Sequence, residues 1–417
     1  MTHSSARAAF AQNLGARHAT GNIWRLVFMS ATILTILFLA TLIVSIVDDA
    51  FGYVVMANDV DPSTLIRDGV QLEDQSDTQL RLTLEEHLSP RRYRAMEREL
   101  PLDQRERPDL LEIALTEIIK PQVALTYSLF ESLFDKNAIR QEASEKHPGG
   151  QVVFRSWVSL RFLTAPQSSR PMSTGVMTAL KGTLLTILIT ILVAFPVGIA
   201  AAIWLEEYAS DNLLNRIIRV NIYNLAGVPS IIYGMLGLAV FVRSMESFTS
   251  GAMFGVSTGG EVANGRTIMS AGLTLALLIL PVIIINAQEA IRAIPGSLRH
   301  SSLAVGATKW QTIGHHILPA SLDRILTGAV LAISRAIGET APLVVVGAST
   351  FLTRDPDSVF SKFTTLPIQI YQWTSRPQTE FRHLAAAAIL VLLVLMLSLN
   401  AFAIITRNKL RKQKRFG

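Results

Sequence analysis

The residues best placed to do chemistry are an arginine and a glutamate, Arg335 and Glu339, which lie four positions apart in an apolar segment. On one helix, residues four apart lie on the same face one turn apart, so these two side chains can form an ion pair. Placing each charged residue at the centre of a membrane helix costs roughly 2.5 to 3.5 kcal/mol. Such residues therefore face a bundle interior or a polar cavity, where they mark substrate pathways. A structural salt bridge between helices is the alternative, and the charge pattern alone leaves it open.

Six apolar segments, each long enough to cross a bilayer, organise the chain around this pair. They cover residues 23–47, 183–204, 217–242, 268–287, 325 to about 351, and 384–405. Of the 417 residues, 50% are hydrophobic and 17% are charged, which is typical of a membrane protein. Four prolines in these segments are expected to break or bend their helices: Pro196, Pro229, Pro281 and Pro342. The sequence therefore predicts an all-α polytopic membrane protein with six transmembrane helices and a transmembrane domain over residues 172–406.

Residues 48–171, between the first two apolar segments, are predicted to form a small α+β domain outside the membrane. A helix-like pattern covers residues 103–120, and an alternating pattern over residues 151–162 predicts a strand. The strand would place one set of side chains on one face: Val152, Phe154, Val158, Leu160 and Phe162. The acidic residues of this domain show no metal-ligand grouping. Three clustered arginines are interpreted as a solvated face: Arg91, Arg92 and Arg94.

Charges next to the apolar segments predict the orientation. Across residues 290–320 the only charged side chains are basic, and short basic loops remain in the cytoplasm. The first apolar segment then leads outwards, so that the N-terminal segment 1–22 lies inside and residues 48–171 lie outside. The basic tail over residues 407–417 follows the last segment and reads as a cytoplasmic anchor beside anionic lipid, not as a nucleic-acid site. Both termini are therefore expected in the cytoplasm.

The cytoplasmic loop over residues 289–319 carries signals for two short helices. Pro295–Gly296 is expected to end the preceding helix, and Ser297 to cap the next one. Gly306 suits the C-terminal stop of that short helix. Thr308 and Gln311 have the spacing of a capping box, which predicts the start of a second helix. The loop is therefore expected to be structured and to press against a partner.

The end of this loop resembles the EAA loop of ABC importer permeases, because Gly306 is followed thirteen residues later by Pro319, with Leu318 before it. Longer segments resemble the permease subunits of phosphate ABC importers: LAVGATKWQTI (303–313), RAIGETAPL (335–343), NLAGVPSIIYGMLGLAVFV (224–242) and LPIQIYQWTSRP (366–377). The resemblance covers roughly residues 172–417. The sequence departs from the motif at four positions: His300, Ser301 and Ser302, where the family has Glu-Ala-Ala, and His316, where it has isoleucine.

The resemblance implies the type I ABC importer (MetI-like) permease fold and a role in phosphate uptake across a bacterial inner membrane. It also implies a homologous second permease, two ATPase subunits and an external phosphate-binding protein as partners. The residues implied in ATPase coupling are Ser302, Ala304, Gly306, Ala307, Leu318 and Pro319. For the substrate pathway it implies Arg335, Glu339 and Thr340, with the guanidinium donating to phosphate oxygens.

Absent motifs narrow the function further. The chain has no G-x-x-x-x-G-K-[ST] phosphate loop, so ATP and magnesium are expected on a partner ATPase and no cofactor on this chain. It has no cysteine, and His315 and His316 lack the spacing of metal ligands, so no metal site is expected. The sequence leaves three alternatives: a permease for another oxyanion such as molybdate or sulfate, a membrane sensor that uses residues 48–171, and, as the weakest, an intramembrane enzyme that uses Glu339.

Overall fold

The computed structural model describes residues 14–58, 60, 62–67, 69–119, 121–256, 264–348, 351–352 and 354–413. Within this part of the chain, five helices are long and apolar enough to cross a membrane: α2 (Leu14–Ala50), α9 (Met177–Ile203), α13 (Ile268–Arg292), α16 (Leu318–Gly338) and α19 (Thr379–Gln413). A sixth crossing is formed if α10 (Leu213–Ala226) and α11 (Ser230–Gly237), which meet at a bend of 105°, count as one span. The six predicted apolar segments therefore all correspond to helices.

The prolines in these segments act in two different ways. Pro196 and Pro281, expected to break or bend their helices, lie inside the continuous helices α9 and α13 and do not break them. Pro229, by contrast, directly precedes α11 at the 105° bend, and Pro342 lies in the first turn of α17 (Ala341–Val346). Proline is tolerated in a first helical turn because the N–H group it lacks would have no intrahelical partner there.

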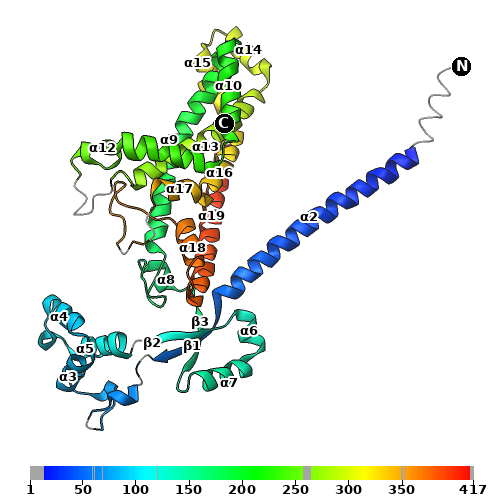
Figure 1. Ribbon diagram of the computed structural model, residues 1–417. Coiled ribbons are helices and arrows are strands. Elements are labelled where there is room, and N and C mark those ends of the chain that lie inside the picture. Colours follow the sequence, from blue (N-terminus) through cyan, green and yellow to red (C-terminus); the bar gives the residue numbers. More distant parts are fainter. Residues whose placement is uncertain are drawn as a thin grey trace.

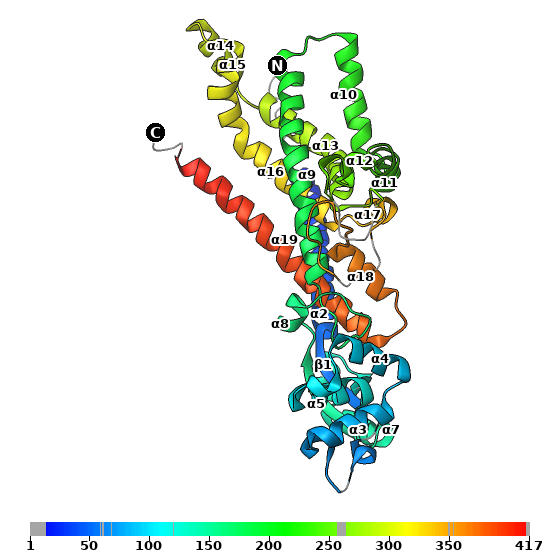
Figure 2. The same cartoon turned by 90° about the vertical axis from the view of Figure 1, so that its left-hand side faces the viewer.

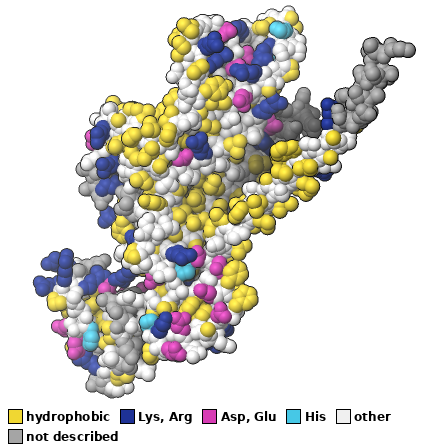
Figure 3. Space-filling model, turned by 45° about the vertical axis from the view of Figure 1, so that its right-hand side comes forward, with side chains coloured by type: hydrophobic (Ala, Val, Ile, Leu, Met, Phe, Trp, Pro, Cys, Tyr) yellow, Lys and Arg dark blue, Asp and Glu magenta, His cyan; other side chains and the backbone are white. Residues whose placement is uncertain are grey.

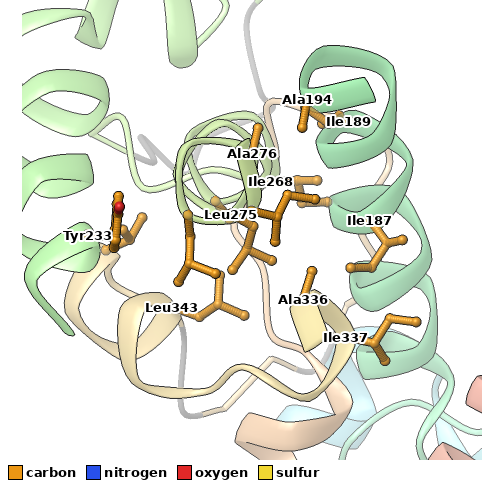
Figure 4. Packing of buried hydrophobic residues seen from close by; sticks show 14 of the residues in the cluster. Ile187, Ile189, Ala194, Tyr233, Ile268, Leu275, Ala276, Ala336, Ile337 and Leu343 are labelled. Carbon is orange, nitrogen blue, oxygen red and sulfur yellow. The ribbon is translucent and has the colours of Figure 1, made fainter. Parts of the chain in front are cut away.

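Helix α13 is the centre of the transmembrane domain. It packs most extensively against α9 and next against α16, and α11 and α17 also contact it. Figure 4 shows Leu275 of α13 between side chains of these neighbours, with Ile187 of α9 on one side and Leu343 of α17 on another. Helix α2 packs against α19, and most of its apolar surface is exposed in the isolated chain.

The domain over residues 48–171, called the external domain because it is predicted to lie outside the membrane, contains a three-stranded antiparallel sheet in the order β2-β1-β3. Its strands are β1 (Phe51–Asn58), β2 (Pro121–Thr126) and β3 (Gln151–Ser156). The chain between β1 and β2 forms a helical lobe with its own apolar core, which includes Leu80, Leu84 and Leu110. The elements of that lobe are α3 (Asp77–His87), α4 (Pro90–Glu99), α5 (Arg107–Ile113), a π-helical turn (Ala114–Ile119) and 3-10 turns at Pro62–Leu65, Leu72–Asp74 and Leu102–Gln104. Between β2 and β3 lie α6 (Leu129–Phe134) and α7 (Lys136–Lys146).

Two local predictions for this domain need correction. The strand expected over residues 151–162 ends at Ser156, and α8 (Leu160–Thr164) follows it. The side chain of Ser159 caps α8 by accepting a hydrogen bond from the N–H of Phe162, so the alternating pattern is overridden by a helix start. The helix expected over residues 103–120 is divided into the 3-10 turn, α5 and the π-helical turn, and residue 120 lies outside the described residues.

Aromatic side chains join the external domain to the transmembrane domain. Trp157, which follows β3, is buried and stacks on His383 of α19 with the ring centroids 5.6 Å apart. Phe162 of α8 contacts Trp373 of α18 (Leu366–Thr374). The Nδ1 atom of His383 also lies 2.6 Å from the carbonyl oxygen of Asp49. The sheet is therefore packed directly onto the ends of α18 and α19.

The external domain and the predicted coupling loop lie at opposite ends of the molecule (Figures 1 and 2). The loop contains α14 (Gly296–Ala304) and α15 (Lys309–Thr312), and a π-helical turn (Ile313–Ile317) leads from it into α16. On the face shown in Figure 3, hydrophobic side chains cover the middle of the molecule and charged side chains gather toward both ends. This distribution suits a protein whose middle lies in a bilayer.

The remaining short elements are π-helical turns at Trp204–Tyr208 and Leu238–Ser244, α12 (Glu246–Thr249) and a 3-10 turn at Ala252–Phe254.

Candidate translocation and coupling sites

The helix that carries Arg335 ends earlier than the sequence indicated. A single helix was expected from residue 325 to about residue 351, but α16 ends at Gly338 and Glu339 has an extended backbone, with φ −73° and ψ 125°. Pro342 explains the break, because it has no N–H group to donate to the carbonyl of Gly338 four residues earlier. The chain resumes as the short helix α17, which ends at Gly347 in the left-handed region, with φ 105°.

The predicted ion pair forms across this helix end. The Nε atom of Arg335 lies 3.3 Å from Oε1 of Glu339, and the two side chains are 46% and 17% exposed. The pair is therefore not intrahelical as expected, since Glu339 has already left the helix. Arg335 lies on a stripe of α16 that the rest of the described chain leaves exposed, and this stripe consists of Arg324, Thr327, Leu331, Arg335 and Gly338.

Helices α11 and α17 pack closely beside the break. A Cβ atom on Gly234 of α11 would lie 2.6 Å from the Cα atom of Pro342, so this glycine permits a backbone contact that no larger residue allows. The hydroxyl of Tyr233 donates to the carbonyl oxygen of Leu225 across the α10–α11 bend, at 2.8 Å. Thr340, the third predicted pathway residue, is half-buried, and its hydroxyl has no partner within the described residues. Two broken helices thus meet close to the Arg335–Glu339 pair.

The loop over residues 289–319, called the coupling loop after its predicted role, is structured, as expected. The capping box is present, because Thr308 accepts from the N–H of Gln311 at 3.3 Å and the Gln311 side chain accepts from the N–H of Thr308 at 2.9 Å. Gly306, with φ 86°, follows the end of α14. Two details were wrong. The preceding helix α13 already ends at Arg292, and α14 begins at Gly296, so Ser297 lies inside that helix and does not cap it.

The six predicted coupling residues have different environments. Ser302 is buried, and its hydroxyl lies 2.9 Å from that of Thr312, so it holds α14 against α15. Ala304 and Gly306 are exposed, and Ala307 is partly exposed. Leu318 and Pro319, both partly buried, begin α16. The exposed end of the loop also presents a shallow hollow of about 320 Å³, which is lined by Val305, Gly306, Ala307, Gln311, His315 and His316.

Two acidic residues that the sequence reasoning missed hold this loop in place. Glu207, in the π-helical turn after α9, accepts hydrogen bonds from Nε and Nη2 of Arg299 at 3.0 and 2.8 Å. Glu206 accepts from Arg292 at 2.7 Å and from Gln288 at 3.1 Å. Lys309 adds a contact of 3.4 Å to the carbonyl oxygen of Glu207. The available signal was the presence of two adjacent acidic residues just after the second apolar segment, while residues 290–320 carry only basic charges.

The C-terminal segment is also part of the helix bundle. Helix α19 continues through the predicted basic tail as far as Gln413, and the residues after it lie outside the described part of the chain. Arg407 donates to the hydroxyl of Thr327 at 2.9 Å and lies 3.7 Å from Asp323, and both partners belong to α16. Ser334 of α16 donates to Asn400 of α19 at 2.8 Å. The described start of the tail therefore contacts α16, a role that its composition did not indicate.

Comparison with known proteins identifies the family. The model of the family described as "Binding-protein-dependent transport system inner membrane component" matches residues 194–412, more than half of the chain. The chain belongs to this family. It is therefore a multi-pass membrane permease subunit of an ABC importer, not an enzyme in its own right, and membership implies an ATPase and a substrate-binding protein as partners. Residues 48–171 lie outside the matched region.

Individual relatives agree with this assignment. The probable ABC transporter permease protein YqgI of Bacillus subtilis (strain 168) is 30% identical over 260 residues, which cover 59% of this chain and 83% of that protein. The phosphate transport system permease protein PstA of Yersinia pestis is 33% identical over 234 residues, or 55% of this chain and 71% of that protein. The protein of the same description from Xylella fastidiosa is 30% identical over 238 residues, or 57% and 76%. The predicted resemblance to phosphate importer permeases and the predicted fold class are confirmed.

Proposed function

We propose that this permease imports inorganic phosphate and that Arg335 lies on the path of the anion. Two observations support the proposal. Several relatives are phosphate transport permeases, and this chain contains segments typical of such permeases, RAIGETAPL among them. In addition, Arg335 carries a positive charge in the last turn of the apolar helix α16, on a face that its own chain leaves exposed.

The geometry of the pair suits a site that binds an oxyanion and releases it. Glu339 is bonded to the Nε atom of Arg335, which leaves the terminal Nη groups free to donate to phosphate oxygens. The carboxylate also places a negative charge beside the site, so the anion is not held too tightly to leave. The free hydroxyl of Thr340 adds a further donor at the same helix break.

Transport would follow an alternating-access cycle driven by a partner. In this proposal residues 48–171 lie outside the cell, while the loop 289–319 and both termini lie in the cytoplasm. Two ATPase subunits bind ATP and magnesium, and their closure moves the coupling loop. A homologous permease covers the exposed face of α16, and an external phosphate-binding protein delivers the cargo. Because α16 joins the loop to Arg335, movement of the loop changes the side to which Arg335 is open.

The test is ATP-dependent uptake of labelled phosphate into vesicles that hold the reconstituted complex, with Arg335→Gln compared to the native chain. We expect uptake to fall at least about tenfold, since a charge-assisted hydrogen bond contributes about 1.5–3 kcal/mol. Arg324→Gln, which removes a charge from the same exposed stripe, is the matched control and should transport normally. Co-purification of the ATPase shows whether the complex is intact.

Undiminished phosphate uptake by an intact Arg335→Gln complex would make the ion pair structural and place the path elsewhere. Uptake of molybdate or sulfate in preference to phosphate by the native complex would retain the permease but contradict phosphate as its cargo.

A further inference from the structure

A large cavity lies where the external domain meets the transmembrane domain. Its volume is about 820 Å³. Three parts of the chain form its walls: strands β2 and β3 with the turn into α8, the segment 169–173 that leads to α9, and the first turn of α19. The lining residues are Gln122, Val123, Arg155, Ser156, Ser159, Arg161, Ser169, Arg170, Pro171, Met172, Ser173 and Glu380. Basic and hydroxyl side chains therefore dominate its polar surface.

Arg155 of β3 is the partly buried charge of this cavity. Its guanidinium lies 4.8 Å from the ring centroid of Trp157, and Nη1 contacts the sulfur of Met172 at 3.2 Å. Among the described residues no carboxylate pairs with it, and its buried Nε has no hydrogen-bond partner. Burial, and after it the nearby positive charge of Arg161, lowers the pKa of Arg155. The native fold thus places the guanidinium groups of Arg155 and Arg161 in the lining of one cavity, and within the described residues neither forms an ion pair with a carboxylate.

The other charged groups of the lining leave this imbalance in place. Arg170 is already paired with Glu117, at 3.4 Å. Glu380 is the one carboxylate in the lining and forms no ion pair with Arg155 or Arg161. A partly buried charge without a partner is costly, and the cost is removed when an anion binds beside it. The charge of the lining therefore favours the binding of an anion.

We propose that this cavity binds a phosphate-bearing anion between Arg155 and Arg161. Guanidinium groups bind carboxylate and phosphate through paired hydrogen bonds. Phosphate is favoured here because two guanidinium groups on different elements, together with nearby serine hydroxyls, match a dianion with several acceptor oxygens better than a carboxylate. The volume falls in the range of small-molecule sites, and Val123, Pro171 and Met172 offer apolar surface for the body of a phosphate ester.

The position of the site connects its occupancy to a transmembrane helix. Trp157 lies against Arg155 on one side and against His383 of α19 on another. Glu380 contributes a wall of the cavity from the same helix, one turn before His383. An anion bound at Arg155 would therefore touch both the external sheet and the outer end of α19. This inference does not depend on the identity of the transported cargo.

The experiment is equilibrium dialysis on the complete complex in phosphatidylcholine nanodiscs, prepared without the external binding protein and with Arg335→Gln to remove the transport path. Three probes separate the possible sources of the ligand. Two of them are soluble and labelled: inorganic phosphate and glycerol 3-phosphate. The third is phosphatidylglycerol, which is included in the nanodisc lipid and competes with the soluble probes. Arg155→Gln and Arg161→Gln should each weaken binding about tenfold or more, and Glu380→Gln should strengthen it severalfold because a repelling charge is lost.

Arg91→Gln, which removes an exposed arginine of the same domain outside the cavity lining, should leave binding unchanged. Arg161 is exposed, so its variant tests the site even if the Arg155 variant does not fold. Displacement of a bound probe by phosphatidylglycerol would identify a lipid headgroup as the ligand, and tighter binding of glycerol 3-phosphate than of phosphate would identify a soluble ester. The proposal would be overturned if no probe bound the native cavity at millimolar concentration. It would also be overturned if the Arg155 and Arg161 variants bound the probes as tightly as the native chain does.

Discussion

The two ends of α9 hold their neighbouring loops by different means. At one end, Glu207 accepts two hydrogen bonds from Arg299 of the coupling loop; the Glu207 side chain is 12% exposed and that of Arg299 is 24% exposed. At the other end, Lys181 and Thr178 of α9 bind Asp355 of the connection between α17 and α18, at 2.5 and 2.8 Å. Lys181 and Asp355 are 41% and 31% exposed. The first contact is better shielded from water than the second.

This difference suits two different mechanical roles. Besides Glu207, the planar guanidinium of Arg299 bonds the carbonyl oxygens of Ile291 and Ile294, so it joins α9, α13 and α14 in one fixed geometry. The ammonium of Lys181 is a point charge on a flexible stem and binds an irregular segment. A loop that transmits movement from a partner needs a rigid contact such as that of Arg299, because a flexible contact would not pass the movement on. A loop that must rearrange when a path opens needs a flexible contact such as that of Lys181.

The largest effect is expected when the contact between Glu207 and Arg299, called the inner joint, is removed. Glu207→Gln removes the charge that binds Arg299, and hydrogen bonds to charged groups contribute about 1.5–3 kcal/mol. We expect the coupling loop to open about tenfold to hundredfold more often. The measurement is the rate of trypsin cleavage after Arg299 or Lys309 in the full chain in nanodiscs. This rate is proportional to the population of the open loop when the loop recloses faster than it is cleaved.

Asp211→Asn is the matched control for that experiment. Asp211 is exposed in the same connection between α9 and α10, and the described structure gives it no ion pair. Its loss should leave the cleavage rate unchanged. Equal rates for the Glu207 variant and the native chain would show that the loop is held by packing alone.

Much of the fold could be predicted because its signals are local. Apolar segments of membrane length predicted the five long helices of the described chain and the bent pair that can form a sixth span, and the Thr308–Gln311 spacing predicted the capping box. Pro342 was expected to break or bend a helix. The sequence did not show that the break would fall at Gly338 and leave Glu339 outside α16. The strand expected over residues 151–162 was wrong in its second half. There Ser159 caps a short helix, although apolar and polar residues alternate as in a strand.

The candidate sites could be predicted only in part, because charge pairing between distant segments leaves no local pattern. Arg299 and Arg155 look alike in the sequence. In the structure Arg299 meets Glu207, 92 positions away, whereas Arg155 meets an aromatic ring, a sulfur atom and a second guanidinium within electrostatic range. Only the fold therefore shows that Arg299 connects two segments of the chain and that Arg155 lines a cavity.

A smaller effect is expected when the contact between Lys181 and Asp355, called the outer joint, is removed. Asp355→Asn removes the charge that binds Lys181, but both side chains are about a third or more exposed, and such pairs contribute about 0.2–1 kcal/mol. We expect amide hydrogen exchange in the described segment 354–365 to rise by about one-and-a-half-fold to fivefold. Asp357→Asn is the control, because Asp357 is exposed in the same segment and has no ion pair in the described structure. A rise as large as that at the inner joint would contradict the contrast between the two ends.

The smallest effect is a dependence of the outer joint on pH. Desolvation acts to raise the pKa of Asp355, but the hydrogen bonds from Lys181 and Thr178 and the charge of Lys181 outweigh it, so the pKa lies below its usual range. A carboxyl group with a lowered pKa in the folded state stabilises above its unfolded pKa, near 4, and loses that contribution as the pH falls through the folded value. Hydrogen exchange in segment 354–365, corrected for intrinsic rates, should therefore stay constant from about pH 7 to 5 and rise only below about pH 4. Asp355→Asn should abolish the rise, and a change that begins near pH 6 would assign the joint to a histidine instead.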